Sequence, residues 1–557
     1  TENVAEFARG TFSGPTALAF DSRGRLFVST LSGKILILLD NNEDGRADEV
    51  KTFATGLEQS LGLTFHSNGD LYVTSNIFHN RGRILRVRDL DGDDVADETT
   101  VIVDNLPSAG DHQTNRPRFG PDGLLYFGQG SATDNGTPVS PGAPSEGPLN
   151  AAILRVDVND PVVEVFATGL RNPFGITFHP ENGALFSTDG GSGEICQLGD
   201  CSGPDLSPPE EINWVVRGGN YGFPACEGTP DDERPGCAGV RAPIHQFSPH
   251  TTPTSVNFYT GPQAGNFKNQ LLVTLFKEFN GNGGDLRRVT VEGDPVNGFQ
   301  TAGTPADFIL RINPIDPGDG PVDAAIDPIT GDIYVARFDP LPHRDPNEHH
   351  NFIYRMRRKG SDALTFIGPP LPSAVKAGTG PVTISINGRR LKPGAVIFFD
   401  DTAVTTRPGA NQFELLADLP ANLVATERVF TVEVRNADGT RSNQQQFAVT
   451  KSGIPDPQPK TPQLSSMFVY KKKRTQVITP VTAVNKAKKF RLVVNGADFD
   501  EGAQLVVGGV SLEIESRSAT EIVGRFPNKM LVSPASFSVQ VRNENGRVSN
   551  TLTLTVL

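Results

Sequence analysis

Hydrophobic and polar positions in the first 360 residues recur as short apolar runs that follow glycine-containing turns. The clearest examples are DSRGRLFVST from Asp21, HSNGDLYVTS from His66, GPDGLLYFGQG from Gly120, HPENGALFST from His179 and DPITGDIYVAR from Asp327. Asn-Gly and Asp-Gly pairs tolerate positive φ and favour tight hairpins between strands. The apolar runs are far shorter than the roughly 18 residues of a membrane-spanning helix. The pattern predicts short strands and turns, and no transmembrane segment.

These hairpins belong to a longer repeat. FATGL occurs at Phe53 and at Phe166, each time ahead of a new hairpin, and third strands such as KILILL from Lys34 follow the hairpins. Four strands with a period of roughly 45–60 residues are typical of a β-propeller blade. We place six blade starts near residues 14, 58, 112, 171, 251 and 320. The opening strand, from Val4, resembles the last strand of a blade, so we expect it to close the sixth blade. A parallel solenoid would need shorter and more regular repeats.

A second kind of repeat follows. ISINGRRLKPGAVIFFDD from Ile384 is matched by LVVNGADFDEGAQLVVGG from Leu492, and VEVRNADGTRSN from Val432 by VQVRNENGRVSN from Val539. Units of this length with alternating strands predict Ig-like β-sandwiches, and they resemble the IPT/TIG type. The expected fold is therefore all-β: a six-bladed β-propeller over 1–360, an Ig-like domain over 361–452 and a second over 463–557.

The composition agrees with this division, and the two parts of the chain carry net charges of opposite sign. The 557 residues include 58 glycines and 44 prolines, which suits many turns, and the formal net charge is −13. Residues 361–557 hold 23 basic and 16 acidic residues, so they carry +7 and the first 360 residues carry −20. An acidic propeller argues against nucleic acid as a partner, because phosphate binding needs clustered Lys and Arg.

The four cysteines lie close together in the chain. Their spacing lacks the paired CxxC pattern of a zinc site. Two disulfides are the better interpretation, most simply Cys196–Cys201 and Cys226–Cys237, although four cysteines allow three pairings. Disulfides predict an extracytoplasmic location: periplasmic, secreted or at the cell surface.

Two acidic loops follow the third strands of the first two blades. The candidate ligands are Asp40, Asn42, Asp44 and Asp48 in the first loop, and Asp89, Asp91, Asp93 and Asp97 in the second. Oxygens at positions 1, 3, 5 and 9 of a tight loop can converge on one Ca²⁺ ion. We predict a structural calcium site in each loop; the alternative is a solvated acidic turn.

Several motifs carry a family resemblance. DH at Asp111 precedes FGPDG, and GLRNP at Gly169, EEINWVVRGGNYGFP at Glu210 and TSVNFYTG at Thr254 follow in order. With these motifs the chain resembles the glucose/sorbosone dehydrogenase family, over about residues 1–360. The resemblance implies a site on the propeller axis where pyrroloquinoline quinone (PQQ) accepts a hydride from a sugar C–H.

The resemblance also implies roles for individual residues. His112 is the expected base, with Asp111 behind it to orient and charge-stabilise the imidazole. Arg171 and Asn172 are expected to face the quinone oxygens, where a cation stabilises developing negative charge. The remaining cofactor-binding candidates are Gly190 and Gly191, whose carbonyls would hold a cofactor-bound Ca²⁺, Lys277, which would bind a cofactor carboxylate, and His250 at the same mouth.

The chain departs from the glucose dehydrogenases at the start of the sixth blade. Those proteins carry an Arg-x-Arg-Asp segment that grips the cofactor. This chain instead reads GPVD from Gly320 to Asp323, which is closer to the sorbosone-type branch, as is His250. Losing two cationic partners of a tricarboxylate weakens charge-assisted binding.

The sequence therefore favours an enzyme that oxidises a sugar or related alcohol, with PQQ and Ca²⁺ as cofactors and an external electron acceptor. Two alternatives remain: a non-catalytic propeller that binds an extracellular glycan or protein, and a calcium-dependent hydrolase of the lactonase kind, since six-bladed propellers host several chemistries. The Ig-like domains are expected to contact a cell-envelope or extracellular glycan or protein.

Overall fold

The computed structural model describes most of the chain. The described residues are 3–9, 14–193, 207–228, 236–261, 267, 270–276, 284–302, 306–312, 320–339, 351–357, 364–452, 462, 463–471, 474–478, 490–497, 499–500, 502–518, 521–525, 535–543 and 548–556. Strands make up the regular structure of these residues. Within them, no helix is long and apolar enough to cross a membrane.

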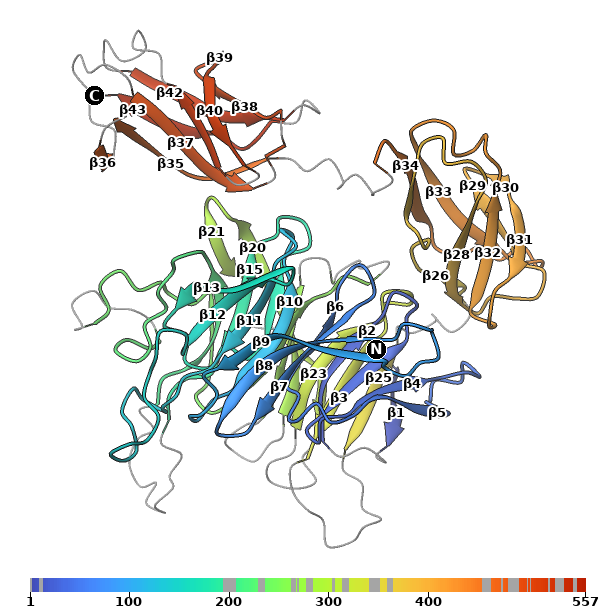
Figure 1. The fold of residues 1–557 in the computed structure, drawn as a ribbon, viewed down its shortest axis with the longest axis horizontal. Coiled ribbons are helices and arrows are strands. Elements are labelled where there is room, and N and C mark those ends of the chain that lie inside the picture. Colours follow the sequence, from blue (N-terminus) through green and yellow to red (C-terminus); the bar gives the residue numbers. More distant parts are fainter. Residues whose placement is uncertain are drawn as a thin grey trace, which may run out of the picture. The chain divides into compact units, whose positions relative to one another are not determined.

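The first 25 strands form six sheets, the blades of a propeller (Figure 1). Blade 1 contains β2 (Pro15–Phe20), β3 (Leu26–Thr30), β4 (Ile35–Leu39) and β5 (Glu49–Ala54). Blade 2 contains β6 (Leu63–Phe65), β7 (Leu71–Ile77), β8 (Arg81–Arg88) and β9 (Glu98–Leu106). Blade 3 contains β10 (Thr114–Phe119), β11 (Leu125–Gln129), β12 (Ala152–Asp157) and β13 (Asp160–Thr168).

The other three blades follow in chain order. Blade 4 contains β14 (Ile176–Phe178), β15 (Leu185–Asp189), β16 (Glu210–Val215) and β17 (His245–Phe247). Blade 5 contains β18 (Pro253–Phe258), β19 (Gln270–Leu275), β20 (Gly284–Asp294), β21 (Gly298–Thr301) and β22 (Ala306–Ile312). Blade 6 contains β23 (Gly320–Ile326), β24 (Ile333–Phe338), β25 (Phe352–Arg357) and β1 (Asn3–Arg9).

The sixth blade closes the ring as the sequence predicts. Strand β1 pairs antiparallel with β25, with Asn3 opposite Arg357 and Arg9 opposite Phe352. The N-terminal strand therefore completes a sheet whose other three strands lie more than 300 residues later in the chain.

The hairpins from the first to the second strand use the same turn in blades 1, 2 and 3, and a turn one residue longer in blades 4 and 6. In blade 1 the amide of Asp21 donates to the carbonyl oxygen of Arg25 at 3.1 Å, and the Gly24 amide donates back to Asp21 at 3.0 Å. Gly24 has a φ of 74°, a conformation that glycine adopts without steric cost. The turn is the physical basis of the Gly-containing motif that recurs along the chain.

The core of the propeller lies between neighbouring blades. Phe27 of blade 1 packs edge-to-face on Phe65 of blade 2, with 4.9 Å between ring centroids. Tyr126 of blade 3 packs in the same way on Phe178 of blade 4, at 5.2 Å. Such pairs stabilise beyond the area they bury. Because each blade has two such neighbours, the first strands β2, β6, β10, β14, β18 and β23 line a common axis.

The later strands form two sandwiches, each of two sheets. The first joins β26 (Phe366–Ile367), β28 (Val382–Arg389), β32 (Glu414–Leu419) and β31 (Thr405–Pro408), and faces them with β27 (Ala374–Lys376), β34 (Gln445–Thr450), β33 (Arg428–Arg435), β29 (Val396–Phe399) and β30 (Thr402–Ala403). The second joins β36 (Arg474–Ile478), β35 (Gln463–Lys471), β37 (Phe490–Ala497), β41 (Glu521–Arg525) and β40 (Glu513–Arg517), and faces them with β39 (Val510–Ser511), β38 (Gln504–Val507), β42 (Ala535–Arg542) and β43 (Leu552–Val556).

Each sandwich contains its own copy of one asparagine hydrogen bond, at equivalent positions of the repeat. The Asn443 side chain accepts a hydrogen bond from the Ile367 amide at 2.7 Å, and the Asn550 side chain accepts one from the Leu464 amide, also at 2.7 Å. Both asparagines come from the repeated SN motif. The structure thus confirms an all-β fold of a six-bladed propeller followed by two β-sandwiches.

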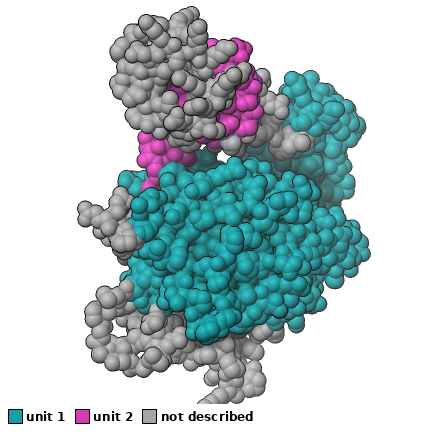
Figure 2. Space-filling view, turned by 60° about the vertical axis from the view of Figure 1, so that its left-hand side comes forward, with its two compact units in different colours: residues 1–292, 300–453 teal, residues 293–299, 454–557 magenta. Residues whose placement is uncertain are grey.

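The chain divides into two compact units (Figure 2). The first comprises residues 1–292 and 300–453, and the second comprises residues 293–299 and 454–557. The propeller and the first sandwich thus share a unit. The division of the chain into domains at 360, 452 and 463, and the IPT/TIG type of the sandwiches, stay predictions.

Candidate functional site

Loops at one end of the propeller axis carry most of the predicted catalytic and cofactor-binding residues. His112 lies two residues before β10, Arg171 and Asn172 lie shortly before β14, and His250 lies shortly before β18. Gly190 directly follows β15, the antiparallel partner of β14. In an antiparallel pair, the end of one strand lies beside the start of the next. These residues therefore gather at one end of the propeller axis, the mouth of the candidate site.

His112 is held in a single tautomer by Ser131. The Ser131 hydroxyl donates to the carbonyl oxygen of Thr133 at 2.7 Å. The Ser131 hydroxyl oxygen lies 3.0 Å from Nδ1 of His112. Because the Ser131 proton is already used, this oxygen accepts the hydrogen bond from Nδ1, and Nδ1 carries the ring proton. Since a neutral imidazole has one donor and one acceptor nitrogen, Nε2 is an acceptor. Burial, and then the charge of Arg171, lower the pKa of His112 to about 3, so the ring is neutral.

Ser131, and not Asp111 as expected from the sequence, makes the hydrogen bond that orients the His112 ring. The Asp111 side chain is exposed, and its amide donates to the carbonyl of Ala132 at 3.2 Å. The loop that carries Ser131 is fixed from the other side, because the Glu146 carboxylate accepts the amides of Ala132 and Thr133 at 3.1 and 2.9 Å. A neutral hydroxyl orients the imidazole here.

Arg171 and Asn172 are anchored through their backbone. Their amides donate to the two oxygens of Asp189, at 3.0 and 2.7 Å. Burial, followed by the neighbouring Glu211 carboxylate, raises the pKa of Asp189 well above its usual value. Asp189 ends β15, so this strand sets the position of the GLRNP loop.

The Arg171 side chain is tied to two other segments. Its Nε donates to the Asp134 carbonyl at 2.7 Å, Nη1 donates to the Gly190 carbonyl at 3.2 Å, and Nη2 pairs with the Asp134 carboxylate. The guanidinium, which is largely buried, therefore has its charge partly neutralised by Asp134.

A glycine lets His112 and Asn172 approach one another. A Cβ added to Gly130 would lie 2.2 Å from the Cβ of His112 and 3.2 Å from the Asn172 Oδ1. Asn115 fixes the Asn172 amide by donating to Oδ1 at 2.9 Å. The structure therefore brings His112, Arg171 and Asn172 together.

Glu210 joins Gly191 to the segment of His250. Its carboxylate accepts the Gly191 amide at 3.1 Å and the His250 amide at 3.0 Å. The His250 ring lies over Gly193, where a Cβ would be 2.6 Å from Cε1. Burial is the main cause that raises the pKa of Glu210 to about 7. Gly190, Gly191 and His250 thus belong to the same mouth as His112.

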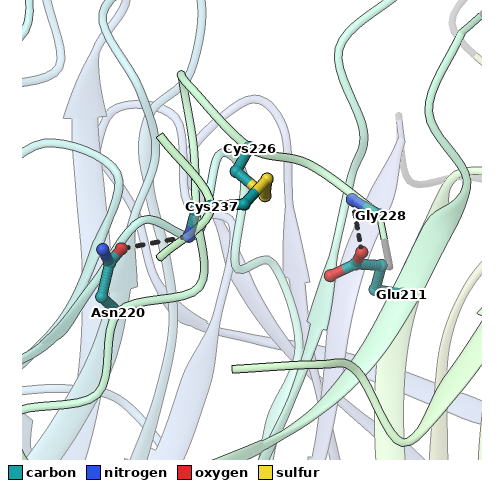
Figure 3. The surroundings of a disulfide bond; sticks show 6 residues. Glu211, Asn220, Cys226, Gly228 and Cys237 are labelled. Carbon is teal, nitrogen blue, oxygen red and sulfur yellow. Dashed lines mark hydrogen bonds between the residues drawn. A yellow bond between two sulfur atoms is a disulfide. The ribbon is translucent and has the colours of Figure 1, made fainter. Parts of the chain in front are cut away.

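A disulfide lies beside two more carboxylates near Glu210, the buried Glu211 and the half-buried Glu227. Cys226 is bonded to Cys237, which confirms one of the predicted pairs. The neighbouring Gly228 amide donates to Glu211 at 3.1 Å (Figure 3), and Glu227 accepts the amide and hydroxyl of Ser192 at 2.8 and 2.5 Å. The bridge therefore fixes the segment that holds the loop after Gly191.

Several residues of the candidate site carry no recognisable signal in the sequence. Ser131, Asp134, Asp189 and Glu227 lie far from His112 in sequence, and no motif marks them. The Glu210–Glu211 pair carried a usable signal, since two adjacent carboxylates at the start of an apolar strand must bury at least one.

Some predicted residues fall outside the described part of the chain. Lys277 does, as do Cys196 and Cys201. The residues from Gly320 to Asp323 at the start of blade 6 are described and buried. Asp323 there is paired with Arg116.

The two acidic loops differ in how far their oxygens converge. In the second loop Asp89, Asp91 and Asp97 each have a carboxylate oxygen within 4.8 Å of the others, while Asp93 accepts the Val95 amide at 2.8 Å. The calcium prediction is thus best supported for three of the four candidates.

Carboxylates of both loops accept backbone amides, and in the first loop one carboxylate also forms an ion pair with an arginine. Asp40 pairs with Arg355 at 3.0 Å, Asp44 accepts the Arg46 amide at 2.9 Å and Asp48 accepts the Asn42 amide at 3.1 Å. The Asn42 side chain accepts the Asp44 amide at 2.9 Å.

Comparisons with known proteins identify the family. Residues 12–303 match the family described as Glucose / Sorbosone dehydrogenase. The curated protein "Quinoprotein glucose dehydrogenase B" of Acinetobacter calcoaceticus is 26% identical over 263 residues, which is 39% of this chain and 52% of that protein. The chain thus matches about half the length of this relative.

Solved structures resemble the chain over a similar region. The PQQ-bound aldose sugar dehydrogenase of Streptomyces coelicolor is 19% identical, with a TM-score of 0.48 over 64% of this chain and 98% of that one. The PQQ domain of pyranose dehydrogenase from Coprinopsis cinerea is 16% identical, with a TM-score of 0.49 over 64% of this chain and 95% of that one. The family match spans more than half of the sequence and includes His112, Arg171 and Gly190, and the chain therefore belongs to the glucose/sorbosone dehydrogenase family.

Proposed function

We propose that this protein is a quinone-dependent oxidoreductase that oxidises a sugar or related alcohol. Family membership supports the reaction class. The observation that carries the proposal is the state of His112: a neutral ring at the mouth of the axis, with Nδ1 held by Ser131 and Nε2 left as an acceptor.

His112 takes the proton of the substrate hydroxyl at Nε2. Removing this proton raises the electron density on the oxygen, which assists loss of a hydride from the adjacent carbon. Nδ1 keeps its hydrogen bond to Ser131 throughout, so the imidazolium that forms has a partner. A Gly at position 130 leaves the ring room beside Asn172.

Arg171 supplies the positive charge of the site, and Asn172 is its neighbour in the chain. Arg171 is held rigidly by Asp134 and by the Gly190 carbonyl, so it offers charge at a fixed place without reorganisation. The substrate oxygen and the hydride acceptor both gain negative charge as the reaction proceeds. A preorganised cation at this mouth stabilises that change.

The residues of the mouth fit PQQ with a bound Ca²⁺ better than PQQ alone. PQQ would lie against Arg171 and Asn172, and when bound it supplies the hydride acceptor. The surrounding carboxylates, Glu210, Glu227 and Asp134, outnumber the described cations. An oxygen-rich surrounding suits a hard cation, and the Gly190 carbonyl retains a lone pair beside its bond to Arg171.

The sixth blade offers the cofactor no cation among its described residues from 320 to 323. Gly320, Pro321 and Val322 are uncharged, and Asp323 is committed to Arg116. Since charge-assisted bonds are the strong ones, we expect PQQ binding to depend steeply on Ca²⁺.

The disulfide supports a location in an oxidising, extracytoplasmic compartment. An external electron acceptor would reoxidise the cofactor there. We assign the contact with an envelope glycan or protein to the two sandwiches.

The test uses the purified full chain with PQQ and Ca²⁺. Calorimetry measures cofactor binding with and without the metal, and reduction of a dye acceptor measures oxidation of a panel of aldoses and alcohols. We expect His112→Gln to lower kcat by about 10²- to 10⁴-fold while PQQ still binds, and His66→Gln, in a turn of blade 2, to leave kcat unchanged.

The outcomes separate the proposal from its alternatives. Absence of PQQ binding in the presence of Ca²⁺ overturns it. Glycan binding without turnover would then indicate a binding propeller, and lactone hydrolysis lost on chelation would indicate a hydrolase.

A further inference from the structure

A second hollow lies on the propeller axis, at the end opposite the candidate site. It has a volume of about 290 Å³ and is lined by residues of all six innermost strands, near their C-terminal ends. This size is at the lower end of the range for small-molecule pockets, about 300–1,000 Å³. The ion pair between Arg116 and Asp323 lies further up the same strands, between this cavity and the His112 mouth.

Four phenylalanines form the aromatic part of the cavity wall. Phe20, Phe65, Phe178 and Phe258 line it, each from a different blade. The first three are half-buried, so their rings are partly available to a ligand. Apolar surface of this kind favours an apolar body of matching size.

One charged side chain enters this wall. Among the described lining residues Arg118 alone is ionisable. Its Nη2 donates to the Asn257 Oδ1 at 2.9 Å, and the Asn257 Nδ2 donates to the Ala324 carbonyl at 2.8 Å. The second bond fixes the amide so that its oxygen faces Arg118. Within the described part of the chain, the other guanidinium donors of Arg118 have no hydrogen-bond partner.

The nearest carboxylate does not neutralise Arg118. Asp323 is paired with Arg116 and also accepts the Leu18 amide at 2.7 Å. Burial lowers the pKa of Arg118, and Asp323 opposes this only in part. Arginine remains charged in proteins, so the cavity holds one net positive charge among uncharged groups.

We propose that this cavity binds a small organic monocarboxylate, with the carboxylate on Arg118 and the apolar body against the phenylalanine rings. A guanidinium fork matches a planar carboxylate with two parallel bonds. A single cation in a small cavity selects one negative charge, and the rings select against a fully hydrated anion. The site is separate from the His112 mouth, and the inference does not depend on the proposed function.

The experiment titrates the full chain with benzoate in a calorimeter. Benzamide serves as the uncharged counterpart and inorganic phosphate as the anion without an apolar body. We expect saturable binding of one benzoate per chain, and at least tenfold weaker binding of both comparison ligands.

Two variants test the cavity by different means. Arg118→Gln removes the charge, and we expect at least tenfold weaker benzoate binding. Thr177→Leu keeps the charge and fills the cavity, because Thr177 lines it; we expect a loss of fivefold or more. The control is Arg217→Gln, at a side chain that is 71% exposed, where we expect no change.

The results decide the proposal in either direction. Loss of binding in both cavity variants, with a normal melting temperature in at least one of them, supports it. Absence of saturable benzoate binding to the wild-type chain overturns it. Equal binding of phosphate and benzoate, or benzoate binding that survives both variants, also overturns it.

Discussion

Arg116 on β10 and Asp323 on β23 form an ion pair across the axis of the propeller. The two side chains are 4% and 0% exposed. Arg116 also donates to the carbonyls of Thr16 and Val322, each at 2.8 Å. One guanidinium thus ties blade 3 to blades 1 and 6.

Breaking this pair on one side should destabilise the propeller strongly. Removing one member of a buried pair leaves an uncompensated charge and costs about 3–5 kcal/mol. We expect Asp323→Asn to lower the free energy of unfolding by this amount in denaturant titrations. The double variant Arg116→Met/Asp323→Leu should recover part of the loss; a double variant less stable than the sum of the two single changes would contradict the buried-charge explanation.

Ser131 should act on catalysis by positioning His112. In Ser131→Ala, Nδ1 loses its acceptor, so the ring can adopt the other tautomer. We expect kcat to fall at least tenfold with KM little changed, and the ¹⁵N chemical shifts of His112 to show a mixture of tautomers. Ser131→Thr keeps the hydroxyl and should restore most of the activity. An unchanged tautomer in Ser131→Ala would show that another group holds the ring.

Glu211 should make stability depend on pH. Burial, opposed mainly by its bond from Asn213, raises its pKa from 4.5 to about 7. The folded state therefore keeps a proton that the unfolded state releases, and the free energy of unfolding falls as pH rises from 4.5 to 7. A shift of this size corresponds to up to about 3 kcal/mol.

The variant Glu211→Gln isolates this contribution. We expect it to flatten the decline in stability between pH 4.5 and 7, measured by chemical denaturation at several pH values. His112 acts in the opposite direction, because its lowered pKa makes stability rise between pH 3 and 6.5. His112→Gln should therefore steepen the decline over pH 4.5–6.5, and parallel curves for all three proteins would contradict both assignments.

The Cys226–Cys237 disulfide should support the site as well as the fold. It closes a short loop, and removing such a bond costs about 3 kcal/mol. We expect Cys226→Ser/Cys237→Ser to lower the melting temperature and to weaken cofactor binding, since Glu227 then holds Ser192 less firmly. Glu227→Gln, which keeps the disulfide, separates the two effects: it should weaken cofactor binding with a smaller loss of stability.

Calcium should stabilise the second acidic loop. We expect chelation to lower the melting temperature by several degrees and added Ca²⁺ to restore it, because the metal neutralises three converging carboxylates. Asp91→Asn should remove most of this response. Asp48→Asn tests the first loop, where we expect a smaller effect because Arg355 already pairs with Asp40. An unchanged melting temperature on chelation would contradict the prediction for both loops.

The fold could be predicted because its signals are local and repeated. Turns of the Gly24 type require positive φ, and Phe53 and Phe166 mark equivalent strands, so most blades can be recognised in the sequence. Closure by β1 could be predicted for the same reason. A strand that resembles the last strand of a blade but precedes the first blade can pair only with the incomplete final blade.

The partners within the site could not be predicted, because they depend on the paths of loops and on packing between blades. Ser131 and Asp111 are both near His112 in space, and only the path of the loop decides that the hydroxyl faces Nδ1. Arg118 stands two residues after Arg116 on the same strand, yet one is paired and the other opens into a cavity. Sequence alone carries no signal for the difference between the two arginines, because their partners Asp323 and Asn257 lie more than 100 positions away in the chain.

The pairing of β1 with β25 makes assembly of the propeller depend on chain length. A nascent chain that ends before residue 352 has no partner for β1, and the unfinished sixth blade exposes the backbone groups of β24 that pair with β25. Unpaired edges of this kind recruit other strands. The ring is therefore a late event in synthesis, and a truncated product is an aggregation hazard rather than a smaller working propeller.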